Sequence, residues 1–207
     1  MSERKVLMLL AWGMFLLLII AIWSGGTLNT TVLIQAGHVG RTTGNIGSIH
    51  NGLKESEWNE RVAIRVEDIL KNNGIIVNRV GAKIPTTNAV IAVAIHFDGS
   101  ENHCATGASI GHDGSMGSQL LAKNWKREYG SFFPFKWHRD NFTKNLSDYY
   151  GFSKVNTSKG FLVLELGEIT CKEQTDWLEP RLGEVAAKVA YFIIKELDND
   201  KKNTTNN

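Results

Sequence analysis

The chain of 207 residues has little proline and little cysteine, with three residues of the first and two of the second. So few prolines, together with 20 glycines and 43% hydrophobic residues, exclude a collagen-like or disordered polypeptide. An excess of charge of one sign is also missing, since 23 lysines and arginines face 21 aspartates and glutamates. This balance argues against a nucleic-acid partner. No internal repeat is visible, and the length fits one ordinary domain.

The two cysteines leave a question open. Cys104 and Cys171 could form a disulfide if the domain is exported, but two cysteines are also few enough to be small packing residues. The sequence does not decide between a bridge and two thiols.

One long hydrophobic run is present near the start. Of the 18 residues in 6–23, only Gly13 is outside the hydrophobic set, and no charge interrupts them. A helix of roughly 20 apolar residues crosses the ~30 Å hydrocarbon layer of a membrane. Arg4 and Lys5 precede the run and no lysine or arginine follows before Arg41. By the positive-inside rule, residues 1–5 are expected in the cytoplasm and the rest outside.

The alternative for the same run is a cleaved signal peptide, after which the protein would be secreted. Signal peptides have apolar segments of roughly 7–15 residues followed by small residues at the cleavage site. The present run is longer, and Ile22-Trp23-Ser24 is a poor cleavage context. We therefore expect a single-pass anchor in the cytoplasmic membrane, with the domain that follows it facing the periplasm or the cell exterior.

The remaining chain alternates strand and helix patterns, after a linker over residues 24–30. Short β-branched or apolar runs predict strands at 31–35, 75–78, 89–95 and 160–166. Apolar residues spaced three or four apart predict helices from Glu55 to before Gly74, around 120–125, and over 178–197. The fold class expected is α/β: one three-layer domain over residues 31–197 with a mostly parallel central sheet flanked by helices. Residues 198–207 are expected to form a disordered tail.

Ionisable residues follow several of these strands, where ligands bind in such sheets. His38 and His96 come just after two strands, Glu165 lies at the end of a third, and Glu55 opens a helix after a glycine-rich loop. Singly, each has an ordinary explanation: a hydrogen-bonding loop histidine, a glutamate favoured by the helix dipole, or half of an ion pair. A carboxylate inside an apolar strand is costly without a partner, so Glu165 is the most informative.

Together these residues have the composition of a catalytic metal site. Two imidazoles and a carboxylate leave the fourth position of a zinc ion for water, whose pKa the metal lowers. A second carboxylate nearby can take the proton from that water and pass it to the leaving amine. We assign His38, Glu55 and His96 to the metal and Glu165 to this general base and acid. Glu57 could be mistaken for the ligand.

Four motifs in order along the chain strengthen the assignment. They are Gln35-Ala36-Gly37-His38-Val39-Gly40, Glu55-Ser56-Glu57-Trp58-Asn59, Ala94-Ile95-His96 and Leu164-Glu165-Leu166-Gly167. They resemble the motifs of the zinc-dependent N-acetylmuramoyl-L-alanine amidases of the amidase-3 type: a strand followed by Gly-His-Gly-Gly, an E-x-x-x-N helix start, a Ser-Ile-His-Ala-Asn strand end and Val-Glu-Leu-Gly-Phe. The resemblance extends over about residues 31–195.

The resemblance implies a zinc hydrolase that cleaves the amide between the lactyl group of N-acetylmuramic acid and the L-alanine of peptidoglycan. It places the zinc ligands on His38, Glu55 and His96 and the catalytic glutamate on Glu165. The chain departs from the family in several places, all of which concern substrate contact: Val39 replaces a glycine, Phe97-Asp98-Gly99 replaces Ala-Asn-Ala, Glu168 replaces a phenylalanine, and the segment 79–90 is short and lacks an arginine-containing helix.

Other features have ordinary interpretations. Residues 123–139 mix six aromatic residues with lysines and arginines, which favours a core covering over a glycan-binding surface. His103, His112 and His138 are expected to be surface histidines. Asn59, four residues after Glu55, fits the motif register and favours Glu55 over Glu57 as the ligand.

The leading hypothesis is a membrane-tethered peptidoglycan amidase. A non-catalytic wall-binding or regulatory protein on the same fold, and a phage lysis amidase (endolysin) held at the membrane until its release, are the alternatives. A protein partner that restrains or activates such an enzyme would fit, but the sequence does not identify one.

Overall fold

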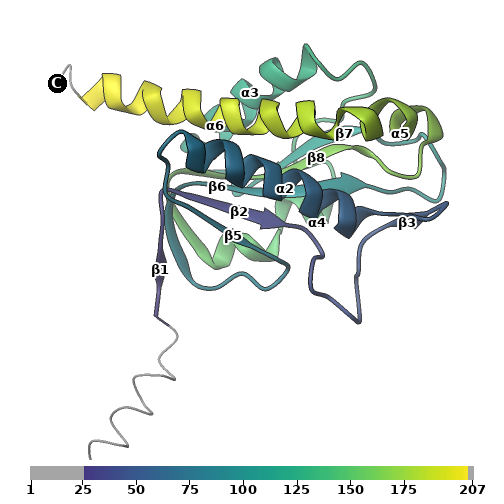
Figure 1. Ribbon diagram of the computed structural model, residues 1–207, viewed down its shortest axis with the longest axis horizontal. Coiled ribbons are helices and arrows are strands. Elements are labelled where there is room, and N and C mark those ends of the chain that lie inside the picture. Colours follow the sequence, from purple (N-terminus) through teal and green to yellow (C-terminus); the bar gives the residue numbers. More distant parts are fainter. Residues whose placement is uncertain (1–25, 205–207) are drawn as a thin grey trace, which may run out of the picture.

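The structure of the protein, a computed structural model, describes residues 26–204 (Figure 1). The predicted cytoplasmic residues 1–5 and the predicted anchor over residues 6–23 lie outside this range. Within residues 26–204, none of the helices combines the length and the hydropathy that crossing a membrane requires.

A six-stranded sheet forms the centre of the domain. Its path is β5-β2-β6-β8-β7, and the short β1 pairs with the start of β6. All neighbouring strands are parallel except β7, which runs antiparallel to β8. The bounds are β1 Leu28–Asn29, β2 Val32–Ala36, β5 Val77–Val80, β6 Thr87–Asp98, β7 Ala108–His112 and β8 Val155–Glu168. The predicted α/β domain with a mostly parallel sheet is confirmed.

Helices cover both faces of the sheet. The long helices α2 (Glu55–Asn72), α3 (Met116–Gly130) and α6 (Leu182–Thr204) pack on one face and on one another (Figure 1). The short α4 (Lys144–Ser147) and the 3-10 turn η1 (Tyr150–Ser153) lie on the opposite face. Outside these layers are the hairpin of β3 (Ile49–His50) and β4 (Leu53–Lys54), helix α5 (Lys172–Leu178) and the turn η2 (Glu179–Arg181).

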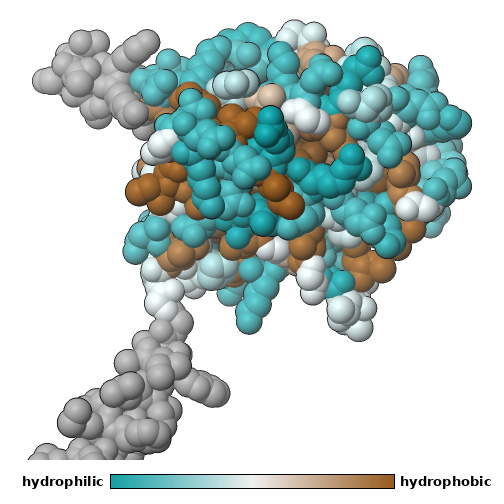
Figure 2. All heavy atoms as spheres, in the orientation of Figure 1, coloured by the Kyte–Doolittle hydropathy of each residue, from teal (hydrophilic) through white to brown (hydrophobic). Residues whose placement is uncertain are grey.

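The core is divided by the sheet, as the alternation of side chains along a strand requires. On β6, Ile91, Val93 and Ile95 pack under α2 and α6, whereas Ala92 and Ala94 face α4 and η1. Hydrophilic side chains cover much of the outer face of α2 and α6, with hydrophobic patches between them (Figure 2). The aromatic segment belongs to this core, because Trp125, Tyr129 and Phe133 are buried.

The structure differs from the sequence predictions in three places. Strand β7 was not predicted, because its sequence Ala-Ser-Ile-Gly-His has neither an apolar run nor a strict alternation. The predicted linker over 24–30 contains β1, so the sheet begins there. Helix α6 continues to Thr204, so the predicted disordered tail is helical over most of its length. Residues 198–204 are all polar, so hydrophobic periodicity could not predict a helix there.

Candidate metal centre

A cleft of about 740 Å³ opens at the carboxyl ends of β2, β6 and β8. The loop after β2 forms one wall, the loop after β6 a second, and the residues around α4 a third. His38, Glu55, His96 and Glu165 all line this cleft. The four side chains that were singled out in the sequence therefore share one cavity.

Three of these side chains converge on one point. Nε2 of His38 lies 3.2 Å from Oε1 of Glu55, and Nδ1 of His96 lies 3.0 Å from the same oxygen. One ligand atom from each residue lies within 4.8 Å of the other two. Two imidazole nitrogens and a carboxylate oxygen at this spacing fit a divalent transition metal of the zinc type.

The chain around His38 is shaped to allow this convergence. A Cβ at Gly37 would lie 2.2 Å from Cε1 of His96, so only glycine admits that ring against the backbone. His38 itself has a φ of 63°, a left-handed conformation that costs energy in a non-glycine residue and that is found most often at functional sites. Asn59 donates to the carbonyl of Gly37 and to Oε1 of Glu55, which connects α2 to the loop after β2.

The other nitrogen of each histidine is fixed by a further partner. Nδ1 of His38 lies 3.0 Å from the carbonyl of Asn45, which can only accept a hydrogen bond. Nδ1 therefore carries a proton, and Nε2 is the nitrogen available to a metal.

A chain of hydrogen bonds decides which nitrogen of His96 is available to a metal, and here it is Nδ1. The hydroxyl of Tyr150 donates to the carbonyl of Ala82, and the amide of Gln35 donates to that hydroxyl. The hydroxyl of Tyr149 in turn donates to Oε1 of Gln35 over 2.7 Å. The oxygen of Tyr149 then accepts a hydrogen bond from Nε2 of His96, 3.3 Å away. Nδ1 of His96 is left facing Glu55.

The charges of the cluster reinforce one another. Burial alone would raise the pKa of Glu55, but its hydrogen bonds and electrostatic contacts with His38 and His96 hold that pKa well below its usual range. Burial would lower the pKa of His38, and the Glu55 carboxylate raises it instead. The carboxylate is therefore ionised at neutral pH, which is the form that binds a cation.

Glu165 lies beside the cluster without joining it. It is the register partner of His96 across β6 and β8. Its Oε2 is buried and has no hydrogen-bond partner among the described residues. Burial raises its pKa well above the usual value, and the charges of Asp98 and Glu55 raise it further. A raised pKa is typical of a carboxyl group that serves as both general base and general acid.

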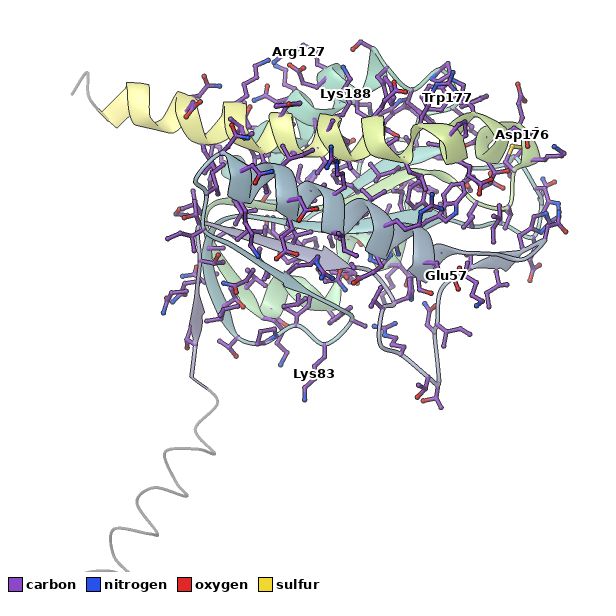
Figure 3. All side chains as sticks on the ribbon, viewed as in Figure 1. Glu57, Lys83, Arg127, Asp176, Trp177 and Lys188 are labelled. Carbon is purple, nitrogen blue, oxygen red and sulfur yellow. A yellow bond between two sulfur atoms is a disulfide. The ribbon has the colours of Figure 1, made fainter. Side chains whose placement is uncertain are left out.

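The competing candidates take no part in this cluster. Glu57 lies on the outer side of α2 and pairs with Lys54 (Figure 3). His103 packs against His50 and His138 stacks on Phe142. The register argument from Asn59 agrees with this geometry.

Residues 32–195 match a sequence family described as N-acetylmuramoyl-L-alanine amidase. The match extends over most of the chain and includes the four side chains discussed above, His38, Glu55, His96 and Glu165. The chain belongs to this family.

Solved structures agree with this assignment at the level of fold. AmiC2 of Nostoc punctiforme, an N-acetylmuramoyl-L-alanine amidase, aligns with a TM-score of 0.60 at 20% identity, over 84% of this chain and 98% of that one. An N-acetylmuramoyl-L-alanine amidase from Clostridium difficile 630 aligns with 0.62 at 19% identity, over 83% and 97%. The CwlD amidase from Clostridioides difficile, solved in complex with the GerS lipoprotein, aligns with 0.61 at 16% identity, over 82% and 99%. The comparison with curated proteins finds no match.

The amidase also contains site residues that sequence reasoning did not single out. Tyr149 and Tyr150 follow no apolar run, and Gln35 was interpreted only as the end of a strand and the start of the first motif. Each acts through a partner that is distant in sequence, as Tyr149 and Gln35 are, which lie 114 positions apart. No local pattern could have indicated them.

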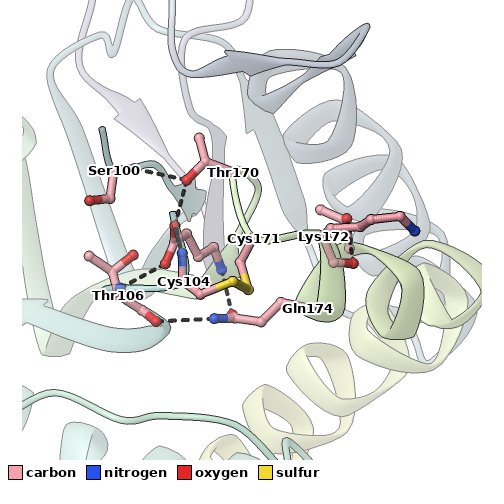
Figure 4. Close-up of a disulfide and its surroundings, with 9 residues drawn as sticks. Ser100, Cys104, Thr106, Thr170, Cys171, Lys172 and Gln174 are labelled. Carbon is pink, nitrogen blue, oxygen red and sulfur yellow. Dashed lines mark hydrogen bonds between the residues drawn. A yellow bond between two sulfur atoms is a disulfide. The ribbon is translucent and has the colours of Figure 1, made fainter. Parts of the chain in front are cut away.

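The amidase has a disulfide beside the cleft, between Cys104 and Cys171 (Figure 4). This resolves the question that the sequence left open. The bridge joins the loop after β6 to the residue that precedes α5.

Proposed function

We propose that this amidase hydrolyses the bond between N-acetylmuramoyl residues and L-alanine in peptidoglycan with a zinc ion held by His38, Glu55 and His96. The observation that carries the proposal is the convergence of Nε2 of His38 and Nδ1 of His96 on one oxygen of Glu55, in a cleft that Glu165 also lines. When bound, zinc lowers the pKa of a water molecule and polarises the scissile carbonyl.

The remaining steps belong to Glu165. As general base it accepts a proton from the attacking water at its carboxylate, and as general acid it returns that proton to the nitrogen of the departing L-alanine. Its raised pKa suits both directions of transfer. Because Glu165 follows the apolar run 161–164 on β8, its backbone position is fixed by the sheet.

The test uses the full chain, solubilised in detergent and loaded with zinc, on purified sacculi. Release of stem peptides that begin with a free L-alanine amine, detected by mass spectrometry, supports the proposal. A zinc-loaded protein that releases none would contradict it. A protein that binds no zinc by metal analysis, and that behaves identically with Glu165→Gln, would indicate the non-catalytic alternative.

We further propose that residues 6–23 anchor the protein in the cytoplasmic membrane and that the amidase domain faces the periplasm or the cell exterior. The uninterrupted apolar run after Arg4 and Lys5 supports this proposal. A tether keeps the domain close to the wall and raises its effective concentration there.

Two measurements test the anchor. Protein that stays with membranes after alkaline extraction, and that external protease degrades in spheroplasts, supports a permanent anchor. Soluble protein with a new N-terminus indicates a cleaved signal peptide, whereas release on membrane depolarisation indicates a lysis amidase.

A partner protein is part of the same proposal, because the CwlD amidase structure contains a lipoprotein. Co-purification from cross-linked cells tests whether this protein has such a partner.

A further inference from the structure

We propose that Glu168 and the Cys104–Cys171 disulfide together position the loop of residues 99–107 as a substrate-binding wall, so that substrate affinity depends on the oxidation state of the two cysteines. The inference rests on the proposed function, because it concerns the substrate of the same cleft. It adds a positioning residue and a redox dependence that the metal cluster does not require.

The 99–107 loop borders the cleft directly. It connects β6 to β7, and Gly99, Ser100 and Thr106 line the cavity that also contains His96 and Glu165. The groups assigned to zinc binding and proton transfer lie on β6, β8, α2 and the loop after β2, outside this segment. A shift of the 99–107 loop is therefore expected to change what the cleft binds more than the chemistry at its centre.

Glu168 holds this loop from inside the protein. Its side chain is fully buried, at 0% exposure, three residues beyond Glu165 on the same strand. One carboxylate oxygen accepts from the backbone N–H of Cys104 at 2.8 Å, and the other accepts from that of Thr106 at 2.7 Å. The hydroxyl of Thr170 donates to the same oxygen as Cys104, over 2.5 Å. A carboxylate offers only acceptors, and all the groups aimed at it are donors.

Further contacts hold the same loop to the segment that precedes α5. Thr170 accepts from the backbone N–H of Ser100 at 3.0 Å, and the amide of Gln174 donates to the carbonyl of Thr106 at 3.1 Å (Figure 4). The disulfide between Cys104 and Cys171 adds a covalent link between the two segments. Hydrogen bonds and the bridge therefore converge on a few residues of the loop.

Backbone strain at Cys104 is expected to move the 99–107 loop once its constraints are removed. Cys104 has a φ of 64°, and a non-glycine residue in this left-handed region is strained. The disulfide and the bond from its N–H to Glu168 hold it in that conformation. Removal of either constraint lets Cys104 relax toward negative φ, which moves Thr106 relative to the cleft.

The bridge is open to reagents. Cys104 is exposed, whereas Cys171 is 2% exposed. A soluble dithiol such as dithiothreitol reduces it by thiol–disulfide exchange. The S–S bond breaks, two protein thiols form, and the dithiol gives up two electrons and two protons to become a cyclic disulfide.

The experiment measures KM, kcat and the dissociation constant of a soluble N-acetylmuramoyl-L-alanyl peptide for the full zinc-loaded chain, with the bridge oxidised and with it reduced. Reduction is expected to raise KM and the dissociation constant about 10-fold and to leave kcat within about twofold, the pattern of lost binding. Glu168→Gln is expected to do the same, because its amide NH₂ cannot accept from the loop. Reduction of the Glu168→Gln protein should then add less than a further 10-fold, since both changes release one loop.

The matched control is Glu196→Gln, which alters a buried carboxylate of α6 that pairs with Asn124 and Lys159. Its KM should match that of the wild type and should rise on reduction as the wild type does. Glu168→Asp, which keeps the carboxylate, should recover part of the lost affinity.

An unchanged KM and dissociation constant in fully reduced wild-type protein, with two free thiols titrated and zinc retained, would overturn the proposal. A fall in kcat alone would do so too. If Glu168→Gln does not fold, the reduced wild type and the Cys104→Ser/Cys171→Ser protein decide by the same measurements. The dissociation constant needs no turnover, so an inactive wild type would refute the proposed function without affecting this test.

Discussion

His96 and Glu165 lie side by side at the ends of two adjacent parallel strands, as register partners of β6 and β8. His96 faces the Glu55 carboxylate, and Glu165 keeps one carboxyl oxygen buried without a hydrogen-bond partner in the part of the chain that the structure describes. The sheet therefore sets the spacing between the proposed metal ligand His96 and the proposed proton-transfer group Glu165 through backbone hydrogen bonds.

Replacement of Glu165 by Gln is expected to lower kcat by about 10²–10⁴-fold, because the amide cannot accept the proton of the attacking water. Zinc content should not change, since Glu165 lies outside the ligand set. The measurement is stem-peptide release together with metal analysis of the same sample. Glu173→Gln, at an exposed position of α5, is the matched control. Parallel loss of zinc and activity would argue against a role in proton transfer.

The same substitution is expected to stabilise the zinc-free protein at neutral pH. Burial and the charges of Asp98 and Glu55 raise the pKa of Glu165 in the folded state. The folded protein therefore holds this proton more tightly than the unfolded chain, and stability falls as the pH rises from about 4.5 through the raised pKa. Glu165→Gln removes that loss, and each kcal/mol recovered raises Tm by about 2–4 °C. Thermal unfolding at pH 4 and pH 7.5 checks this: the gain should appear only at the higher pH.

Tyr149→Phe is expected to weaken zinc binding about 10–100-fold, the usual cost of losing a group that orients a ligating histidine. The variant removes the oxygen that accepts from Nε2 of His96, and with it the link to Gln35. Competition with a chromophoric chelator measures the affinity. Tyr191→Phe, at a tyrosine of α6 that is 61% exposed, should bind zinc as the wild type does. Equal affinities in both variants would show that Tyr149 does not orient the ligand.

The disulfide is expected to contribute to stability as well as to loop position. It closes a segment with a sequence separation of 67 residues, for which the chain-entropy relation gives about 4 kcal/mol. The Cys104→Ala/Cys171→Ala protein should therefore unfold at lower denaturant concentration, and dithiothreitol should lower the midpoint of the wild type but not that of the variant. Identical midpoints for oxidised and reduced wild type would contradict this.

The sequence predicted which residues gather in the cleft better than it predicted the outer elements of the fold. His38, His96 and Glu165 follow buried strands, and a parallel sheet brings such strand ends together whatever the loops do. Their grouping with Glu55 was therefore predictable, while their catalytic and ligand roles stay predictions. Strand β7 and the Gln35–Tyr149 contact were not predictable, because each depends on packing between segments that share no local pattern. The helical end of α6 lacks the apolar residues on which periodicity depends.

The position of β1 places the first described strand on the side of the domain opposite the cleft. Leu28 and Asn29 pair with Thr87 and Asn88 at the beginning of β6, whereas His96 lies near the end of that strand. Nine residues of strand separate Thr87 from His96, and at a rise of about 3.3 Å per residue they span about 30 Å. The chain thus enters the domain on the side opposite the cleft. If the proposed anchor is present, the cleft therefore lies about the length of this strand away from the point where the anchor joins the domain.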